Sequence, residues 1–120
     1  MKALLLDDDG DLLEVIADLL RANNCQCLLA RSVDSLKALG PQALNADVAV
    51  LDINLGARQP SGLDANEWLI SHDFRGRILF LTGHARTHPL VARAQSLHQA
   101  RVLDKPMGAK DLVNAILGVG

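Results

Sequence analysis

The sequence predicts an α/β fold in which helices cover both faces of a doubly wound, five-stranded parallel sheet. Short apolar runs alternate with amphipathic helical patterns five times along the chain, the order expected of β/α units that build a parallel sheet. The third run, Asp47–Ile53, is apolar at nearly every position, as a strand covered on both faces should be. The length of 120 residues fits one domain with a sizeable core.

The first two β/α units are expected in the N-terminal third of the chain. The strand Lys2–Asp7 runs from apolar residues directly into acidic ones, and the helix Asp11–Asn23 follows. Acidic residues in the first turn of that helix suit the positive end of its dipole. The strand Cys25–Ala30 and the short helix Val33–Leu39, which stops before Gly40, form the second unit. One face of the first helix is apolar and consists of Leu12, Leu13, Ile16, Leu19 and Leu20.

The other three units start from the strand Asp47–Ile53. A loop over residues 55–62 follows it and is rich in residues that break regular structure. His88 and Pro89 begin a later helix, since proline is favoured at the first helical position. The remaining elements are expected at Leu63–Ser71 (helix), Arg77–Thr82 (strand), Arg101–Asp104 (strand) and Ala109–Leu117 (helix).

Composition excludes several classes of protein. A net charge of −2 gives no basic excess of the kind that a dedicated nucleic-acid binder shows. No apolar run approaches 18 residues and residues 1–30 contain no secretory leader, so we expect a cytoplasmic protein without a membrane segment. Cys25 and Cys27 are interpreted as buried, reduced thiols, because Cys-x-Cys alone makes neither a metal site nor an easy disulfide.

Acidic residues gather where predicted strands end. Asp7 and Asp8 leave the first strand, and Asp52 leaves the third. With the strand order 2-1-3-4-5 these strands are central neighbours, and ligands bind where the order reverses. Three carboxylates at about 4 Å repel by about 4 kcal/mol per pair at an effective dielectric near 20 unless a cation intervenes. Their hard oxygens suit Mg²⁺ together with a phosphoryl group.

Two further strand ends carry groups that could bind a phosphoryl oxygen. Thr82 offers a hydroxyl at the end of the fourth strand, and Lys105 offers a positive charge after the fifth. A carboxylate such as Asp52 can itself be the nucleophile and form an aspartyl-phosphate.

Four segments together resemble the receiver domains of two-component response regulators, which have a flavodoxin-like (β/α)5 fold. The resemblance covers essentially the whole chain and implies a single receiver domain over residues 1–120. The segments are Leu-Leu-Leu-Asp-Asp-Asp-Gly-Asp-Leu-Leu-Glu-Val-Ile at 4–16, Val-Leu-Asp-Ile-Asn-Leu at 50–55, Phe-Leu-Thr-Gly at 80–83 and Leu-Asp-Lys-Pro at 103–106.

The resemblance implies how the metal and the phosphoryl group are held. Asp52 looks like the phosphoacceptor, which takes a phosphoryl group from a phosphohistidine on a sensor histidine kinase or a histidine phosphotransfer protein. Asp8 looks like the direct Mg²⁺ ligand, with Asp7 acting partly through water. The backbone carbonyl of Asn54 would complete the metal shell.

The resemblance also implies a conformational switch. Thr82 resembles the hydroxyl that moves toward the phosphoryl group, and Lys105 resembles its counter-charge. Gly83 replaces the small residue that usually follows the threonine and leaves room for transfer. His84, two residues beyond Thr82, is a candidate for tuning access to Asp52. A homodimer through the helix that begins at His88, the fifth strand and the last helix is a further expectation.

Two departures from the family pattern leave alternatives open. Val102 stands where receivers usually have an aromatic ring that turns inward, and a β-branched side chain is too stiff and small for that change. The loop after Asp52 is about two residues longer than the common form, with Pro60 and Gly62 displaced.

A phosphorylation-independent scaffold with the same fold is therefore the alternative function. An aspartyl-phosphate hydrolase is less favoured, because Asp52-Ile53-Asn54 lacks the second acid of an Asp-x-Asp motif, and we expect that the chain is not an enzyme.

Overall fold

The computed structural model describes residues 1–120 except 57–58, 84–87, 98–99, 106 and 119–120. Its strands form one five-stranded sheet in the order β2-β1-β3-β4-β5, and all four pairings are parallel. This confirms the predicted fold class and strand order. The strands are β1 (Lys2–Leu6), β2 (Gln26–Ala30), β3 (Val48–Asp52), β4 (Arg77–Thr82) and β5 (Ala100–Asp104).

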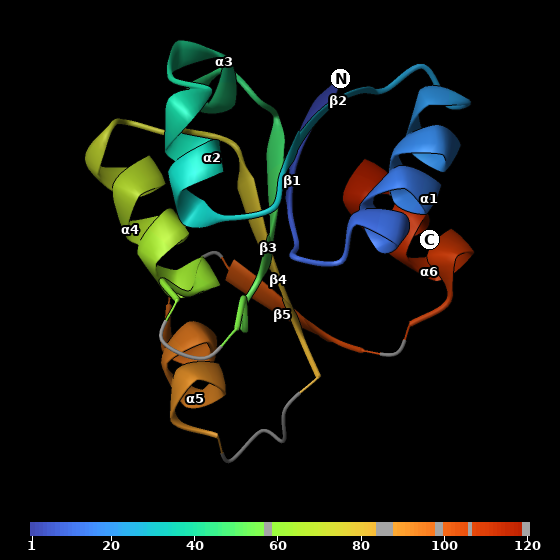
Figure 1. Cartoon of the computed structure of the whole chain (residues 1–120). Helices are drawn as coiled ribbons and strands as arrows, with labels where there is room; N and C mark the ends of the chain where they lie inside the picture. Colours follow the sequence, from blue (N-terminus) through green and yellow to red (C-terminus); the bar gives the residue numbers. More distant parts are fainter. Residues whose placement is uncertain (57–58, 84–87, 98–99, 106, 119–120) are drawn as a thin grey trace.

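Helices cover both faces of the sheet (Figure 1). On one side lie α1 (Gly10–Arg21) and α6 (Ala109–Leu117). The other side carries α2 (Val33–Ala38), α3 (Pro41–Leu44), α4 (Gly62–Ser71) and α5 (Pro89–Ser96). Each side has its own hydrophobic cluster, because successive strand residues point to opposite faces.

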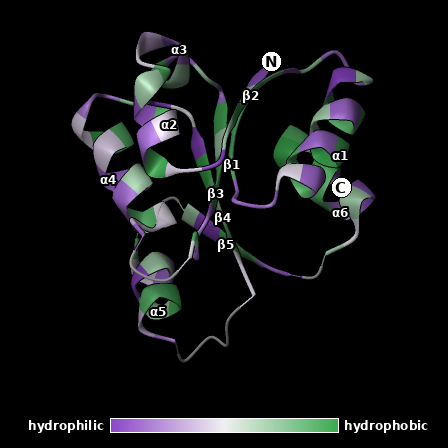
Figure 2. Ribbon diagram, viewed as in Figure 1, coloured by the Kyte–Doolittle hydropathy of each residue, from purple (hydrophilic) through white to green (hydrophobic). Residues whose placement is uncertain are grey.

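The apolar sequence of the central strands explains their burial. All five residues of β3 are buried, and four of the five residues of β1 are buried. Both strands are mostly green in the hydropathy view, whereas the helices carry both green and purple positions (Figure 2). Because the core consists of apolar side chains, the polar residues at the strand ends stand out as exceptions.

Local signals fix the starts of the helices that flank the site. Asp9 is the N-cap of α1, and its side chain accepts a hydrogen bond from the Leu12 backbone N–H at 3.1 Å. Ser61 and Asp64 form a capping box at the start of α4. These caps determine where the loops after β1 and β3 end.

Three sequence predictions need correction. The helix α3 was not predicted, because its four residues are too short to show an apolar period, although Pro41 at its start follows Gly40, which has a positive φ. Leu19 was placed on the buried face of α1 but is 38% exposed, since it lies at the margin of that face and Ala17 fills the inner position. Helix α1 also ends at Arg21 rather than Asn23.

The two cysteines are free thiols, as predicted, but only Cys25 is buried as expected; Cys27 is half-buried. Burial raises the pKa of Cys27 to about 11, which keeps this thiol protonated at neutral pH. Among the described residues, no helix is long and apolar enough to cross a membrane.

Candidate functional site

The carboxyl ends of β1 and β3 bring three aspartates together. The register pairs Leu6 with Leu51, so the residues that follow them, Asp7 and Asp52, lie at the same edge of the sheet. One carboxylate oxygen from each of Asp7, Asp8 and Asp52 lies within 4.8 Å of the others. The predicted cluster at the point where the strand order reverses is therefore present in the fold.

Burial distinguishes this edge from the rest of the core. Within the described part of the chain, the buried polar residues are Asp7, Asp52 and Thr82, which are 3%, 3% and 1% exposed. Asp8 is exposed, so it faces the solvent side of the cluster. Burying charged groups is costly unless they are paired. Two buried aspartates at one edge of the sheet therefore indicate a functional site rather than a packing role.

Lys105 supplies the positive charge of the cluster. Its Nζ donates to Asp7 Oδ2 at 2.8 Å and lies 3.4 Å from Asp52 Oδ2. The lysine is placed by the sheet, since its backbone N–H donates to the Thr82 carbonyl at 2.7 Å. Burial alone would lower the pKa of Lys105, but the hydrogen bond to Asp7 and the charge of Asp52 outweigh it and raise the pKa. The lysine is therefore fully charged at neutral pH.

The charge on Asp52 is disfavoured despite this lysine. Burial, and then the negative charge of Asp7, raise the pKa of Asp52 to about 7, against the lowering effect of Lys105. Three carboxylates and one lysine leave two negative charges uncompensated when all are ionised. A divalent cation matches this excess, and carboxylate oxygens are the donors that hard divalent cations prefer. The residues present thus fit a metal ion.

The other predicted site residues flank the cluster. Asn54 is exposed, and its side-chain Oδ1 accepts from the Gly56 backbone N–H at 3.2 Å. Gly83 is also exposed, and a Cβ there would meet nothing within 4 Å, so the space beside Thr82 is open but does not require glycine. His84 lies outside the described residues.

Val102 is half-buried and packs against the cluster on the α4 and α5 side of the sheet. Its partner across the β4–β5 ladder is Phe80, which is fully buried. The aromatic side chain of this cross-strand pair therefore belongs to Phe80 on β4, and the smaller one to Val102 on β5.

Sequence reasoning missed the structural role of Gly62. A Cβ on this first residue of α4 would overlap the Asp52 carbonyl oxygen and lie 2.9 Å from the Asp52 carbonyl carbon. The Gly62 N–H also donates to the Ile53 carbonyl at 3.2 Å. The loop after Asp52 therefore returns to the backbone of Asp52, and glycine is what allows the approach. A glycine directly after a Ser N-cap was the available signal.

Comparison with known structures supports the same fold. The chain is 26% identical to a response regulator receiver domain protein from Clostridium thermocellum, with a TM-score of 0.78 over 98% of this chain and 91% of that one. The chemotaxis protein CheY4 of Vibrio cholerae is 20% identical, with a TM-score of 0.80 over 99% and 98%.

A third structure carries ligands. It is a response regulator protein from Burkholderia pseudomallei with a phosphorylated aspartic acid, a calcium ion and citrate. The identity is 26% and the TM-score is 0.78, over 96% of this chain and 65% of that one. No curated protein matched the chain.

The family comparison covers nearly the whole sequence. Residues 3–117 match the model of the response regulator receiver domain. The match includes β1 from Ala3 onward, the other four strands, and the aspartates and lysine that the fold brings together. The chain belongs to the response regulator receiver domain family.

Proposed function

We propose that residues 1–120 form one receiver domain that accepts a phosphoryl group on Asp52 in a Mg²⁺-dependent reaction. The observation that carries this proposal is the buried carboxylate pair Asp7 and Asp52, bridged by Lys105. With Asp8 beside them, the ionised cluster carries two excess negative charges. A stable scaffold has no need to bury these groups together, since buried charges reduce stability.

The proposed step is a substitution at phosphorus. An oxygen of the Asp52 carboxylate attacks the phosphorus of a phosphohistidine, and the P–N bond breaks as its electron pair returns to the imidazole. The product is an aspartyl-phosphate. Asp52 must be ionised to attack, and its pKa of about 7 in the absence of metal means that part of it is protonated at neutral pH.

Each chain residue has a distinct role in this proposal. Asp7, Asp8, Asp52 and the Asn54 backbone carbonyl would hold Mg²⁺, with Asp8 as the direct ligand and Asp7 acting partly through water. The ion would neutralise the excess negative charge and orient the phosphoryl oxygens. Lys105 pairs with a phosphoryl oxygen after transfer, because its Nζ already lies 3.4 Å from Asp52 Oδ2.

The fourth strand supplies the proposed switch. Thr82, buried at the end of β4, offers its hydroxyl to the phosphoryl group, and Gly83 leaves the entrance beside it open. Movement of Thr82 would pass to Lys105 through the backbone hydrogen bond that joins them. The expected partner is a sensor histidine kinase or a histidine phosphotransfer protein.

Dimerisation through α5, β5 and α6 and the cytoplasmic location stay predictions from the sequence. The alternative function, a phosphorylation-independent scaffold, is favoured only by Val102, which replaces the usual aromatic ring.

Phosphorylation can be tested with the purified chain. Acetyl phosphate with Mg²⁺ should add one phosphoryl mass to the intact protein, and EDTA should prevent it. Asp52→Asn should abolish the modification, whereas Asp18→Asn on the exposed side of α1 should leave it unchanged. Modification that survives in Asp52→Asn would refute the assignment. A wild-type chain that is not modified at all would favour the scaffold.

A further inference from the structure

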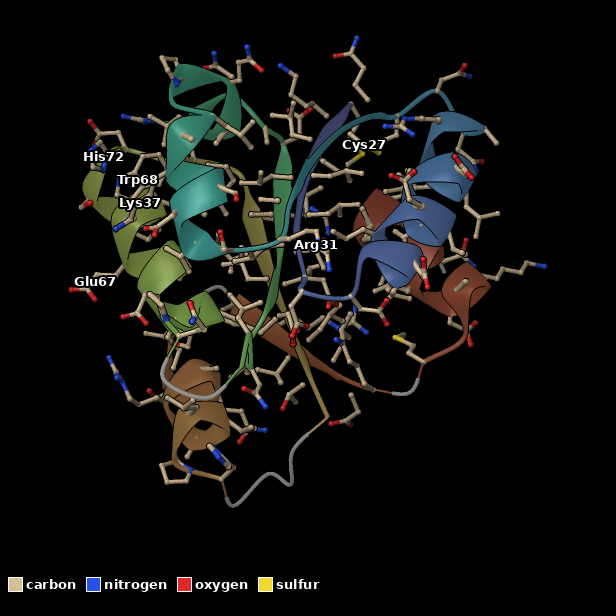
Figure 3. All side chains as sticks on the ribbon, in the orientation of Figure 1. Cys27, Arg31, Lys37, Glu67, Trp68 and His72 are labelled. Atoms are coloured by element: carbon tan, nitrogen blue, oxygen red, sulfur yellow. The ribbon has the colours of Figure 1, made fainter. Side chains whose placement is uncertain are left out.

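Arg31 reaches the turn that carries the acidic cluster. Arg31 follows Ala30, the last residue of β2. The Ala30 carbonyl accepts a hydrogen bond from the Asp7 N–H at 3.1 Å. The Arg31 Nη2 donates to the backbone carbonyl of Asp8 at 3.0 Å. Arg31 thus lies beside the loop that joins β1 to α1 (Figure 3).

Gly10 provides the surface on which this guanidinium lies. A Cβ on Gly10 would be 3.3 Å from Cζ, 3.5 Å from Nε and 3.5 Å from Nη1 of Arg31. Three nearly equal distances mean that the flat face of the guanidinium covers this position. Gly10 does not have a positive φ, so its backbone conformation does not itself require glycine. A Cβ at this position would instead crowd the guanidinium and displace it by a few tenths of an ångström.

The hydrogen bond from Arg31 restrains Asp8, which has fewer other restraints than Asp7 and Asp9. The Asp9 N–H donates to Asp7 Oδ1 at 3.0 Å, and the Asp9 side chain caps α1, so both neighbours of Asp8 are anchored through their side chains. Asp8 itself is exposed, and packing does not restrain its carboxylate. The hydrogen bond from Arg31 restrains its peptide group instead.

A positive charge near a cation site would also weaken metal binding, so the two effects of Arg31 oppose each other. The Arg31 side chain is exposed, so the high dielectric constant of the surrounding water weakens its repulsion of a bound cation. A hydrogen bond from a charged donor is short-ranged and is not lost in this way. We therefore expect the restraint that Arg31 places on Asp8 to affect Mg²⁺ affinity more than its repulsion of the cation does.

We propose that Arg31 is a positioning residue of the metal site: its guanidinium holds the Asp8 carbonyl, and the missing side chain of Gly10 gives it room. This inference rests on the proposed function, because it concerns the aspartate assigned as the direct Mg²⁺ ligand.

A double-mutant cycle on the full chain tests the proposal, with Mg²⁺ affinity measured by titration calorimetry. Gly10→Ala should weaken Mg²⁺ binding roughly threefold or more, the low end of coupling between residues in contact, and should have almost no effect once Arg31→Ala is present. Arg31→Lys keeps the charge without the planar fork and should lose affinity in the same direction as Arg31→Ala. Urea denaturation of each variant in EDTA separates lost affinity from lost folding.

The outcomes are distinct. Additive effects of Gly10→Ala and Arg31→Ala would overturn the proposal, and so would wild-type affinity in Arg31→Lys. Tighter Mg²⁺ binding by Arg31→Ala would show that charge repulsion dominates and would also overturn it. Failure of the wild-type chain to bind Mg²⁺ would instead refute the proposed function on which the inference rests.

Discussion

Replacing Asp52 by Asn should stabilise the metal-free protein at neutral and alkaline pH. Burial and the charge of Asp7 raise the pKa of folded Asp52 from 3.8 to about 7. The folded chain therefore keeps a proton that the unfolded chain loses as pH rises from about 4 to 7, and its stability falls across that window. Each pH unit of this window is worth about 1.4 kcal/mol, which gives a cost of at most about 4 kcal/mol at pH 8 and roughly 2 at pH 5.

Asparagine is nearly isosteric and carries no charge, so it removes this cost. It also weakens the 3.4 Å contact with Lys105, but the lysine keeps its 2.8 Å partner Asp7. Removing one partner of a buried ion pair is destabilising when it leaves a charge uncompensated. Here Lys105 keeps Asp7 as its partner, and the three carboxylates outnumber the lysine, so the substitution removes excess negative charge. We expect a net gain of about 1–3 kcal/mol at pH 8 and less than half of that at pH 5.

Urea denaturation in EDTA at both pH values measures the gain directly. Asp18→Asn is the matched control, because Asp18 is exposed and its ion pair with Arg21 is 3.8 Å long; its effect should be within about 0.5 kcal/mol at either pH. Saturating Mg²⁺ should narrow the gap, since the ion binds the folded wild type and adds to its stability by mass action. A variant that is less stable than wild type at pH 8, or equally stabilised at both pH values, would refute the reasoning.

Three other variants or states test the site. Asp8→Ala should weaken Mg²⁺ binding and slow phosphorylation by acetyl phosphate at least tenfold, a loss of about 1.4 kcal/mol or more; a normal rate in dilute Mg²⁺ would assign the ligand role to another acid. Gly62→Ala should cost about 1–3 kcal/mol in urea denaturation because the methyl group overlaps the Asp52 carbonyl, whereas Gly83→Ala has open space and should change stability little. Beryllofluoride, which mimics the aspartyl-phosphate, should change amide chemical shifts more in the loops after β3 and β4 than on α5 and β5, because Val102 lacks a movable ring; equal changes around Val102 would mean that the signal needs no aromatic switch.

The fold and most of the site could be predicted because their signals are local in sequence. Each parallel strand is a short apolar run, and all such strands end at one edge of the sheet. Asp7, Asp52 and Thr82 each terminate such a run, so their meeting follows from the strand order alone. Lys105 follows a strand in the same way, and its contact with Asp7 needed only the correct topology.

The features that the sequence did not reveal depend on distances between backbones. Gly62 matters because α4 begins against the carbonyl of Asp52; a glycine after a serine N-cap indicates the helix start but does not give that distance. Arg31 matters because β2 places it beside the turn after β1, in a position where an exposed arginine ordinarily contributes only solubility. The helix α3 escaped prediction because one turn has no period to detect.

Stability and proposed chemistry are coupled through the same three side chains. Asp7, Asp52 and Thr82 interrupt an otherwise apolar core at the edge where the strands end. The raised pKa of Asp52 means that the metal-free fold resists the ionised carboxylate that phosphoryl transfer requires. A bound cation would favour the ionised form and so stabilise the fold and prepare the nucleophile together. Changes that relieve the buried charge should therefore make the protein more stable and less reactive, the trade-off expected of a functional site.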